Sequence, residues 1–191
     1  MKGVRAMKFL SKGFSLIELM VTVAILGIVT AIAMPNMTEF MVRMRVDNEV
    51  TEIHSLTVLA KNYAVNSEEV VTVCPLASNN SCSNNWQNEI SVFIDVDGDA
   101  VYEESDNDAI IKVKSAIKDG DQLDFPRTSV RFAPTGRLTG VSNGTFEYCP
   151  QNYADLSRGV IISRSGRAYL SSDTNNDGKE ENRSGGVISC D

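Results

Sequence analysis

The sequence lacks the residues and motifs on which most catalytic sites depend. It holds one histidine, His54, and it has no phosphate-binding glycine loop, no G-x-S-x-G and no H-E-x-x-H. His54 falls in a predicted helix with no second histidine or reactive cysteine nearby, so we assign it no catalytic role. Paired carboxylates occur only in segments typical of turns. These absences argue against an enzyme.

A surplus of positive charge is also missing. The formal net charge is -7, and residues 36–191 carry fourteen basic against twenty-four acidic side chains. Only the first thirteen residues are basic, through Lys2, Arg5, Lys8 and Lys12. Attraction to phosphate is the sequence-independent part of nucleic-acid binding. The acidic body therefore argues against nonspecific binding of nucleic acid over its whole surface, and leaves only a local basic patch open.

The cysteines have no C-x-x-C spacing, which argues against a zinc site. Their number is even, and all follow residue 73 in a chain that we expect to be exported, so we predict two disulfides. Four cysteines allow three pairings. We favour Cys74 with Cys82, which closes a short loop, and Cys149 with Cys190, which ties down the C-terminal tail.

One long apolar run dominates the N-terminal region. Phe14 to Met34 form 21 mostly apolar residues, which as a helix would extend about 31 Å and span a bilayer. The basic residues ahead of the run should stay in the cytoplasm, and the chain after Pro35 should lie outside the inner membrane. Two other interpretations are a signal peptide ending at Ala31-Ile32-Ala33, which would be unusually long, and a plain membrane anchor.

Glu18 does not fit a simple anchor. Burying its carboxylate would cost about 2.5–3.5 kcal/mol at the membrane centre and less near the interface. Cleavage of the Gly13–Phe14 bond would create an α-amino group four residues before Glu18. The new ammonium and the carboxylate could then neutralise each other, within one helix or between neighbouring subunits. Glu18 therefore indicates proteolytic processing just upstream.

The segment K-G-F-S-L-I-E-L (Lys12 to Leu19), followed by a long apolar stretch, resembles the processing motif of type IV pilins and type II secretion pseudopilins. The resemblance implies that a prepilin peptidase cleaves after Gly13 and methylates Phe14. It also implies that Glu18 pairs with the N-terminal amine of an adjacent subunit, and that Pro35 kinks the helix. The expected partners are other pilins or pseudopilins of the filament, the prepilin peptidase and an inner-membrane assembly platform.

Beyond Pro35, apolar residues at a period near 3.6 predict that the helix continues to about Asn66. The members of this stripe are Phe40, Met44, Val50, Ile53, Leu56, Ala60 and Tyr63. We expect an α+β fold in which a long N-terminal helix, part transmembrane and part amphipathic, packs on an antiparallel sheet. The expected domains are a leader peptide at 1–13, a transmembrane helix at 14–35, an amphipathic helix at 36–66 and a β-rich periplasmic domain at 67–191.

Short β-prone runs separated by turn clusters follow the helix. The predicted strands are Val70–Val73, Ile90–Ile94, Ile110–Val113, Ser129–Ala133, Thr145–Cys149, Gly159–Ser163, Ala168–Ser171 and Val187–Cys190.

The segment W-Q-N-E-I-S-V-F-I-D-V-D-G-D (Trp86 to Asp99) is similar to one in the group of H-type pseudopilins and FimT or FimU minor pilins. V-R-F-A-P-T-G-R, T-F-E-Y-C and R-G-V-I-I-S-R-S-G-R resemble later strands of that group. The resemblance implies a pilin-like fold and a minor pilin or pseudopilin of low abundance near a filament tip. It leaves open the type IV pilus and the type II secretion pseudopilus; the disulfide-tied C-terminus and the Gly166-Arg167 pair favour the pilus.

Two acidic loops have the spacing of calcium ligands. The first has acidic residues at positions 1, 3, 5, 9 and 12 of a calcium-loop register, namely Asp95, Asp97, Asp99, Glu103 and Asp106. The second has Asp173, Asn175 and Asp177 at positions 1, 3 and 5, with Gly178 at position 6. Both depart from the pattern, at Ala100 and at Ser184. Because Asp, Asn and Gly are also ordinary turn residues, we prefer plain turns and keep calcium as an alternative.

A local basic patch is predicted between Arg158 and Tyr169, where Arg158, Arg164 and Arg167 occur without an acidic residue. DNA-binding minor pilins of the FimT type carry a G-R-x-R motif. This sequence has Gly166-Arg167-Ala168-Tyr169 instead, and Tyr169 could stack on a base but could not neutralise a phosphate. We therefore prefer arginines that keep a sheet edge soluble, with DNA binding as the alternative.

Overall fold

The computed structural model describes residues 13–190, except for the side chains of residues 32–36. The chain forms two compact units, Met1–Met41 and Val42–Asp191, which we treat separately. The basic residues of the expected leader lie outside the described part of the chain.

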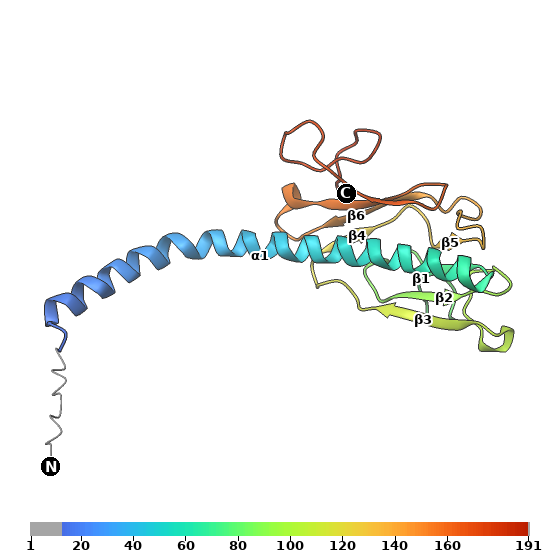
Figure 1. Ribbon diagram of the computed structural model, residues 1–191, viewed down its shortest axis with the longest axis horizontal. Coiled ribbons are helices and arrows are strands. Elements are labelled where there is room, and N and C mark those ends of the chain that lie inside the picture. Colours follow the sequence, from blue (N-terminus) through green and yellow to red (C-terminus); the bar gives the residue numbers. More distant parts are fainter. Residues whose placement is uncertain (1–12, 191) are drawn as a thin grey trace, which may run out of the picture. The chain divides into compact units, whose positions relative to one another are not determined.

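A single α-helix, α1, covers Leu16–Ser67 (Figure 1). It ends where Glu68 adopts the left-handed conformation with a φ of 61°. Its end therefore agrees with the predicted end near Asn66. Pro35 lies inside α1, but its side chain is among those that the structure does not describe, so the expected kink stays a prediction.

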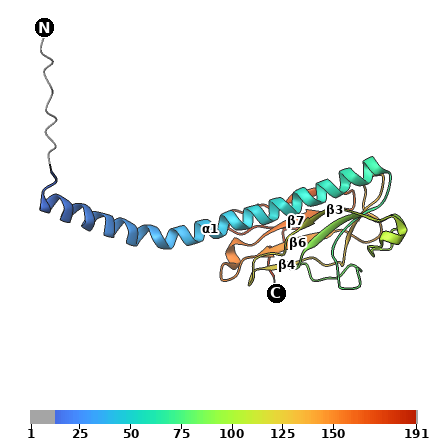
Figure 2. The ribbon, with the colours of Figure 1, turned by 90° about the horizontal axis from the view of Figure 1, so that it is seen from below.

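In the second unit, α1 runs along the strands (Figure 2) and contributes one buried stripe to the core. The buried side chains recur every three or four residues, at Val42, Val46, Val50, Ile53, Leu56, Ala60 and Ala64. The expected stripe was partly wrong, because Phe40, Met44 and Tyr63 are exposed. The buried face consists mostly of valine, isoleucine and alanine, and the three larger side chains lie on other faces of the helix.

Two four-stranded antiparallel sheets complete the second unit. The first has the order β3-β2-β1-β5, from β1 (Val71–Pro75), β2 (Ile90–Ile94), β3 (Ala109–Lys114) and β5 (Val130–Phe132). The second has the order β4-β6-β7-β8, from β4 (Gln122–Asp124), β6 (Gly144–Cys149), β7 (Arg158–Ile162) and β8 (Ala168–Leu170). The predicted α+β fold is confirmed, with two sheets in place of one.

The sequence missed one strand and predicted one that does not form. The missed strand, β4, has three residues and only its middle one, Leu123, is buried, so it has little apolar pattern. The segment Val187–Cys190 forms no strand; Val187 makes an isolated bridge with Glu181. Its backbone is held by this bridge and by the hydrogen bond from the Ile188 N–H to the Glu180 carbonyl, and not by a sheet.

Aromatic side chains pack at the centre of the core. The ring of Trp86 meets that of Phe146 edge to face at 4.9 Å, and Phe125 stacks on Phe146 at 4.1 Å between centroids. The Trp86 indole also donates a hydrogen bond of 2.8 Å to the carbonyl of Arg127. Trp86, which opens the segment similar to H-type pseudopilins, is therefore a core residue.

Candidate functional site

The expected processing junction is exposed. Gly13, Phe14 and Ser15 precede the first residue of α1, and the Phe14 side chain is 78% exposed. A Cβ atom built at Gly13 would meet no atom within 4 Å. Among the described residues nothing crowds Gly13, and the Gly13–Phe14 bond lies outside regular structure, as a protease requires of its substrate.

Ser15 forms the N-terminal cap of α1. The Ser15 hydroxyl accepts a hydrogen bond of 3.2 Å from the backbone N–H of Glu18, and the Ser15 carbonyl accepts one of 3.2 Å from Leu19. A serine three residues before a glutamate is the arrangement of a capping box. The carboxylate of Glu18 lies in the first helical turn, where the helix dipole favours negative charge.

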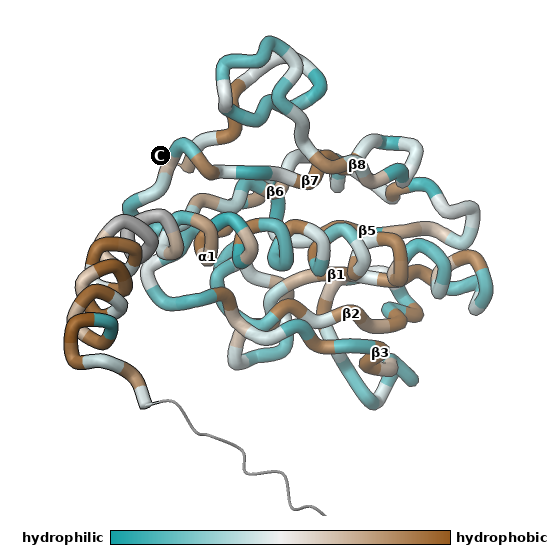
Figure 3. Tube along the Cα trace, turned by 60° about the vertical axis from the view of Figure 1, so that its left-hand side comes forward, coloured by the Kyte–Doolittle hydropathy of each residue, from teal (hydrophilic) through white to brown (hydrophobic). Residues whose placement is uncertain are grey.

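The N-terminal part of α1 is mostly hydrophobic, as its brown tube in Figure 3 shows, and its apolar side chains are exposed. They are Leu16, Ile17, Leu19, Met20, Val21, Val23, Ile25, Leu26, Ile28 and Val29. Among the residues whose side chains are described, no helix has both the length and the apolar composition to cross a membrane. The expected membrane segment 14–35 ends among side chains that lie outside that set.

Ion pairs join α1 to both sheets, a feature that the sequence did not reveal. Lys114 at the end of β3 is buried, and its ammonium lies 2.7 Å from a carboxylate oxygen of Glu49. Arg158 at the start of β7 contacts Asp47 on α1 and lies 3.1 Å from Glu180. Opposite charges on separate elements have no local sequence signal, so these pairs appear only in the folded structure.

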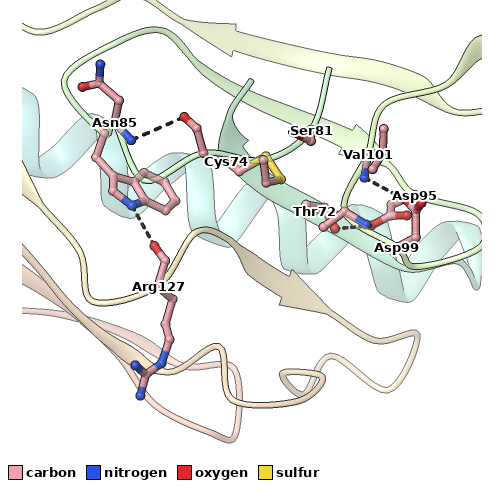
Figure 4. The surroundings of a disulfide bond; sticks show 12 residues. Thr72, Cys74, Ser81, Asn85, Asp95, Asp99, Val101 and Arg127 are labelled. Atoms are coloured by element: carbon pink, nitrogen blue, oxygen red, sulfur yellow. Dashed lines mark hydrogen bonds between the residues drawn. A yellow bond between two sulfur atoms is a disulfide. The ribbon is translucent and has the colours of Figure 1, made fainter. Parts of the chain in front are cut away.

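Two disulfides join the four cysteines in the favoured pairing. Cys74 at β1 bonds to Cys82 across a separation of 8 residues (Figure 4). Cys149 at the end of β6 bonds to Cys190 across a separation of 41 residues. The second bond attaches the C-terminal tail to the second sheet.

The first acidic loop brings Asp95, Asp97 and Asp99 together, with carboxylate oxygens within 4.8 Å of one another. Asp95 is buried and accepts hydrogen bonds from the Thr72 hydroxyl at 2.6 Å and the Ala100 N–H at 3.2 Å (Figure 4). Burial raises the pKa of Asp95. The other two expected ligands, Glu103 and Asp106, are exposed and do not belong to this group of carboxylates.

The second acidic loop brings together Asp173, Asp177 and a residue that the sequence did not single out, Glu181. Asn175 lies in the same loop, where its Oδ1 accepts the Asp177 N–H at 2.9 Å. Glu181 stands at position 9 of the register that begins at Asp173. That position could have been found from the sequence, because calcium loops also take a ligand there.

The three arginines of the predicted basic patch do not gather at one place. Arg164 and Arg167 are exposed on the turn between β7 and β8, whereas Arg158 lies at the opposite end of β7 and is engaged by Asp47 and Glu180. The turn thus offers two exposed guanidinium groups. The acidic partners of Arg158 make it unsuitable for a phosphate.

Two family models match the chain. The model of the prokaryotic N-terminal methylation motif matches residues 9–34, and that of the type II transport protein GspH matches residues 49–166, more than half of the chain. The first spans the Gly13–Phe14 junction and Glu18. The second begins within α1 and runs through β7.

Similar proteins include pilins. A fimbrial protein of Pseudomonas aeruginosa is 41% identical over 61 residues, which is 32% of this chain and 40% of that protein. The type IV major fimbrial protein FimA of Dichelobacter nodosus is 38% identical over 63 residues, which is 33% of this chain and 40% of that one. The match thus spans about 40% of the length of these relatives.

Among solved structures, the Pseudomonas aeruginosa type IV minor pilin FimU superposes with a TM-score of 0.54 at 17% identity, covering 70% of this chain and 92% of that one. This likeness concerns the fold. With the GspH model matched over most of the second unit, the chain belongs to the family of the type II transport protein GspH.

Proposed function

We propose that the chain is a structural subunit of a cell-envelope filament, a minor pilin or pseudopilin, and has no enzymatic activity. One observation carries the proposal: a processing motif stands at the start of α1. The first part of this helix is apolar and exposed, and its second part contributes a buried stripe to the core of the domain. An apolar helix surface of this extent needs lipid or neighbouring helices to cover it.

Processing and assembly follow from the N-terminal sequence. A prepilin peptidase cleaves after Gly13 and methylates Phe14, and Glu18 then pairs with the new amine of an adjacent subunit on the assembly platform. The exposed junction and the Ser15 cap support this order of events. The helix begins at Leu16 and is capped by Ser15, and both residues stay in the chain after cleavage at Gly13.

Before assembly, the subunit is held in the bacterial inner membrane by residues 14–35, with the second unit in the periplasm. The charge pattern supports this orientation, because the four basic residues precede the apolar run and the acidic body follows it. The two disulfides agree with an oxidising compartment. After assembly into a pilus, the same domain would face the outside of the cell.

The filament is either a type IV pilus or a type II secretion pseudopilus. Deletion of the gene separates the two, because it should abolish sheared surface pili in the first case and secretion of exported proteins in the second. Genes for other minor pilins beside this one would favour the pilus, and secretion-pathway genes would favour the pseudopilus. A deletion strain that keeps both pili and secretion would contradict the proposed function.

DNA capture is a second candidate, favoured only by the two exposed arginines on the β7–β8 turn. A gel-shift assay with the purified protein at low salt tests it, with Arg164→Ala and Arg167→Ala combined as the variant. Binding that the double variant loses would support DNA capture by this turn. Absence of a shift with the unaltered protein would end this hypothesis.

A further inference from the structure

We propose that the loop Asp173–Glu181 is a calcium site, formed by the carboxylates of Asp173, Asp177 and Glu181 with the amide oxygen of Asn175. Each of the three acids offers one oxygen within 4.8 Å of the others, a spacing at which one cation can contact all three. The loop belongs to the C-terminal tail that follows β8, drawn in red in Figure 1.

Glu181 is the residue that points to a ligand. Its side chain is only 3% exposed. Its Oε2 accepts hydrogen bonds from the Thr174 N–H at 2.8 Å and the Thr174 hydroxyl at 2.6 Å. Its Oε1 is buried and has no hydrogen-bond partner within the described residues. A buried carboxylate oxygen left without a partner is costly, and a bound cation would remove that cost.

The backbone holds Glu181 where it is. Isolated β-bridges join it to Ser172 on one side and to Val187 on the other. The neighbouring Ile188 N–H also donates a hydrogen bond of 2.8 Å to the carbonyl of Glu180. The carboxylate is therefore fixed at the base of the loop, so a cation would find this ligand already in position.

The other ligands are arranged by the loop itself. Asp173 Oδ1 accepts the Asn176 N–H at 2.7 Å, and its Oδ2 accepts the Gly178 N–H at 2.9 Å. Gly178 has a φ of 88°, so glycine suits this sharp turn at position 6. Because a carboxylate has about four acceptor sites, these hydrogen bonds leave Asp173 able to contact a cation.

The lysine of the loop forms its ion pair with a residue outside the three acids. The Lys179 ammonium lies 3.3 Å from Asp155, outside the group of three acids. Several hard oxygens without a histidine or cysteine favour Ca²⁺ over zinc, and ligands from an irregular loop suit Ca²⁺ better than Mg²⁺, which demands near-octahedral geometry.

The first acidic loop differs in one respect. Asp95 also has a buried Oδ1 without a hydrogen bond, but the guanidinium of Arg131 donates a hydrogen bond of 2.8 Å to the Gly98 carbonyl beside it. A cation thus already stands at that loop. Asp97 and Asp99 therefore provide a matched control, since their replacement removes carboxylates from an acidic loop of similar sequence.

The test is calorimetric titration of the detergent-solubilised full chain with CaCl₂ and, separately, with MgCl₂, after dialysis against a chelator. We expect one Ca²⁺ per chain and a higher melting temperature with Ca²⁺ than with chelator. Asp173→Asn and Glu181→Gln should each weaken Ca²⁺ binding about tenfold or more, because losing even an outer-shell partner of a metal ligand has an effect of that size. Asp97→Asn combined with Asp99→Asn should leave it unchanged.

Three results would overturn the proposal. The first is that Ca²⁺ gives no heat and no change of melting temperature. The second is that Ca²⁺ binding is lost in the Asp97/Asp99 double variant and kept in Asp173→Asn. The third is that Mg²⁺ binds as tightly as Ca²⁺. Asp173 is only partly buried and its carboxylate accepts hydrogen bonds from backbone N–H groups of its own loop, so Asp173→Asn remains informative even if Glu181→Gln fails to fold.

Discussion

Arg45 on α1 and Asp121, just before β4, form a paired contact that fastens the helix to the second sheet. The Arg45 Nε lies 2.8 Å from Asp121 Oδ2, and its Nη2 lies 3.2 Å from Oδ1. The carboxylate is fully buried and also accepts hydrogen bonds from the Tyr148 hydroxyl and, at 2.9 Å, from the Gln151 N–H. One acid therefore connects α1, β6 and the turn that follows β6.

Replacement of that acid should destabilise the fold strongly. Asp121→Ala leaves Arg45, the Tyr148 hydroxyl and the Gln151 N–H without their acceptor, and breaking a buried pair typically costs about 3–5 kcal/mol. Urea unfolding of the purified protein measures the loss. Lys179→Ala is the control, because its pair with Asp155 is exposed and should contribute less than about 1 kcal/mol. A loss below that value for Asp121→Ala would refute the role given to it.

Stability should fall in alkaline solution because of Tyr148. Burial, and then the hydrogen bond to Asp121, raise the pKa of Tyr148 well above the ordinary 10.0. Above pH 10 the unfolded chain loses this proton before the folded one does. The free energy of unfolding therefore decreases as pH rises from there, and the contribution is fully present below pH 10.

Tyr148→Phe should flatten this dependence, although it also removes one hydrogen bond at every pH. Urea unfolding at about pH 8 and about pH 11 measures the difference for each protein. Tyr63→Phe, on the exposed face of α1, should keep the full alkaline decrease. Equal decreases in the Tyr148→Phe variant and the unaltered protein would show that another group is responsible.

The two disulfides should contribute unequally. Loop-closure entropy predicts about 4 kcal/mol for a separation of 41 residues and about 2.5 kcal/mol for 8. Replacing Cys149 and Cys190 by alanine should therefore lower the melting temperature more than replacing Cys74 and Cys82. The reverse order would mean that Cys74, which is buried beside the core, contributes mainly through packing.

Glu18 should matter for assembly and not for folding or processing. Glu18→Val keeps the N-terminal cap, because Ser15 receives the backbone N–H of residue 18 and not its side chain. We expect a processed subunit that is absent from sheared filaments, as judged by immunoblot of cell and filament fractions. Glu18→Asp keeps the charge and should restore part of the assembly. Normal amounts of the valine variant in filaments would argue against an assembly role.

Much of the fold could be predicted from the sequence, because its main signals are local. The apolar period predicted the helix α1, and the β-prone runs predicted seven of the eight strands. The positions of the cysteines led to the favoured disulfide pairing. β4 escaped prediction because three residues with one buried side chain carry almost no pattern. The strand predicted at Val187–Cys190 does not form, because this segment is held by an isolated bridge at Val187 and by the disulfide at Cys190.

The parts that could not be predicted depend on contacts between distant elements. Arg45 and Asp121 are 76 residues apart, and neither has a neighbour in sequence that signals the other. Arg158 looked available for DNA until the fold placed Asp47 and Glu180 beside it. The register of the loop could have pointed to Glu181, but its burial and its unpaired Oε1 appear only in the folded structure.

Mass spectrometry of the protein purified from cells tests the central claim most directly. The account predicts a chain that starts at an N-methylated Phe14 and is lighter by four hydrogens because of two disulfides. Gly13→Ala should leave the leader attached, and since a Cβ there meets no atom within 4 Å, the block would act at the peptidase and not through this fold. A native N-terminus at any residue other than Phe14 would contradict the interpretation as a filament subunit.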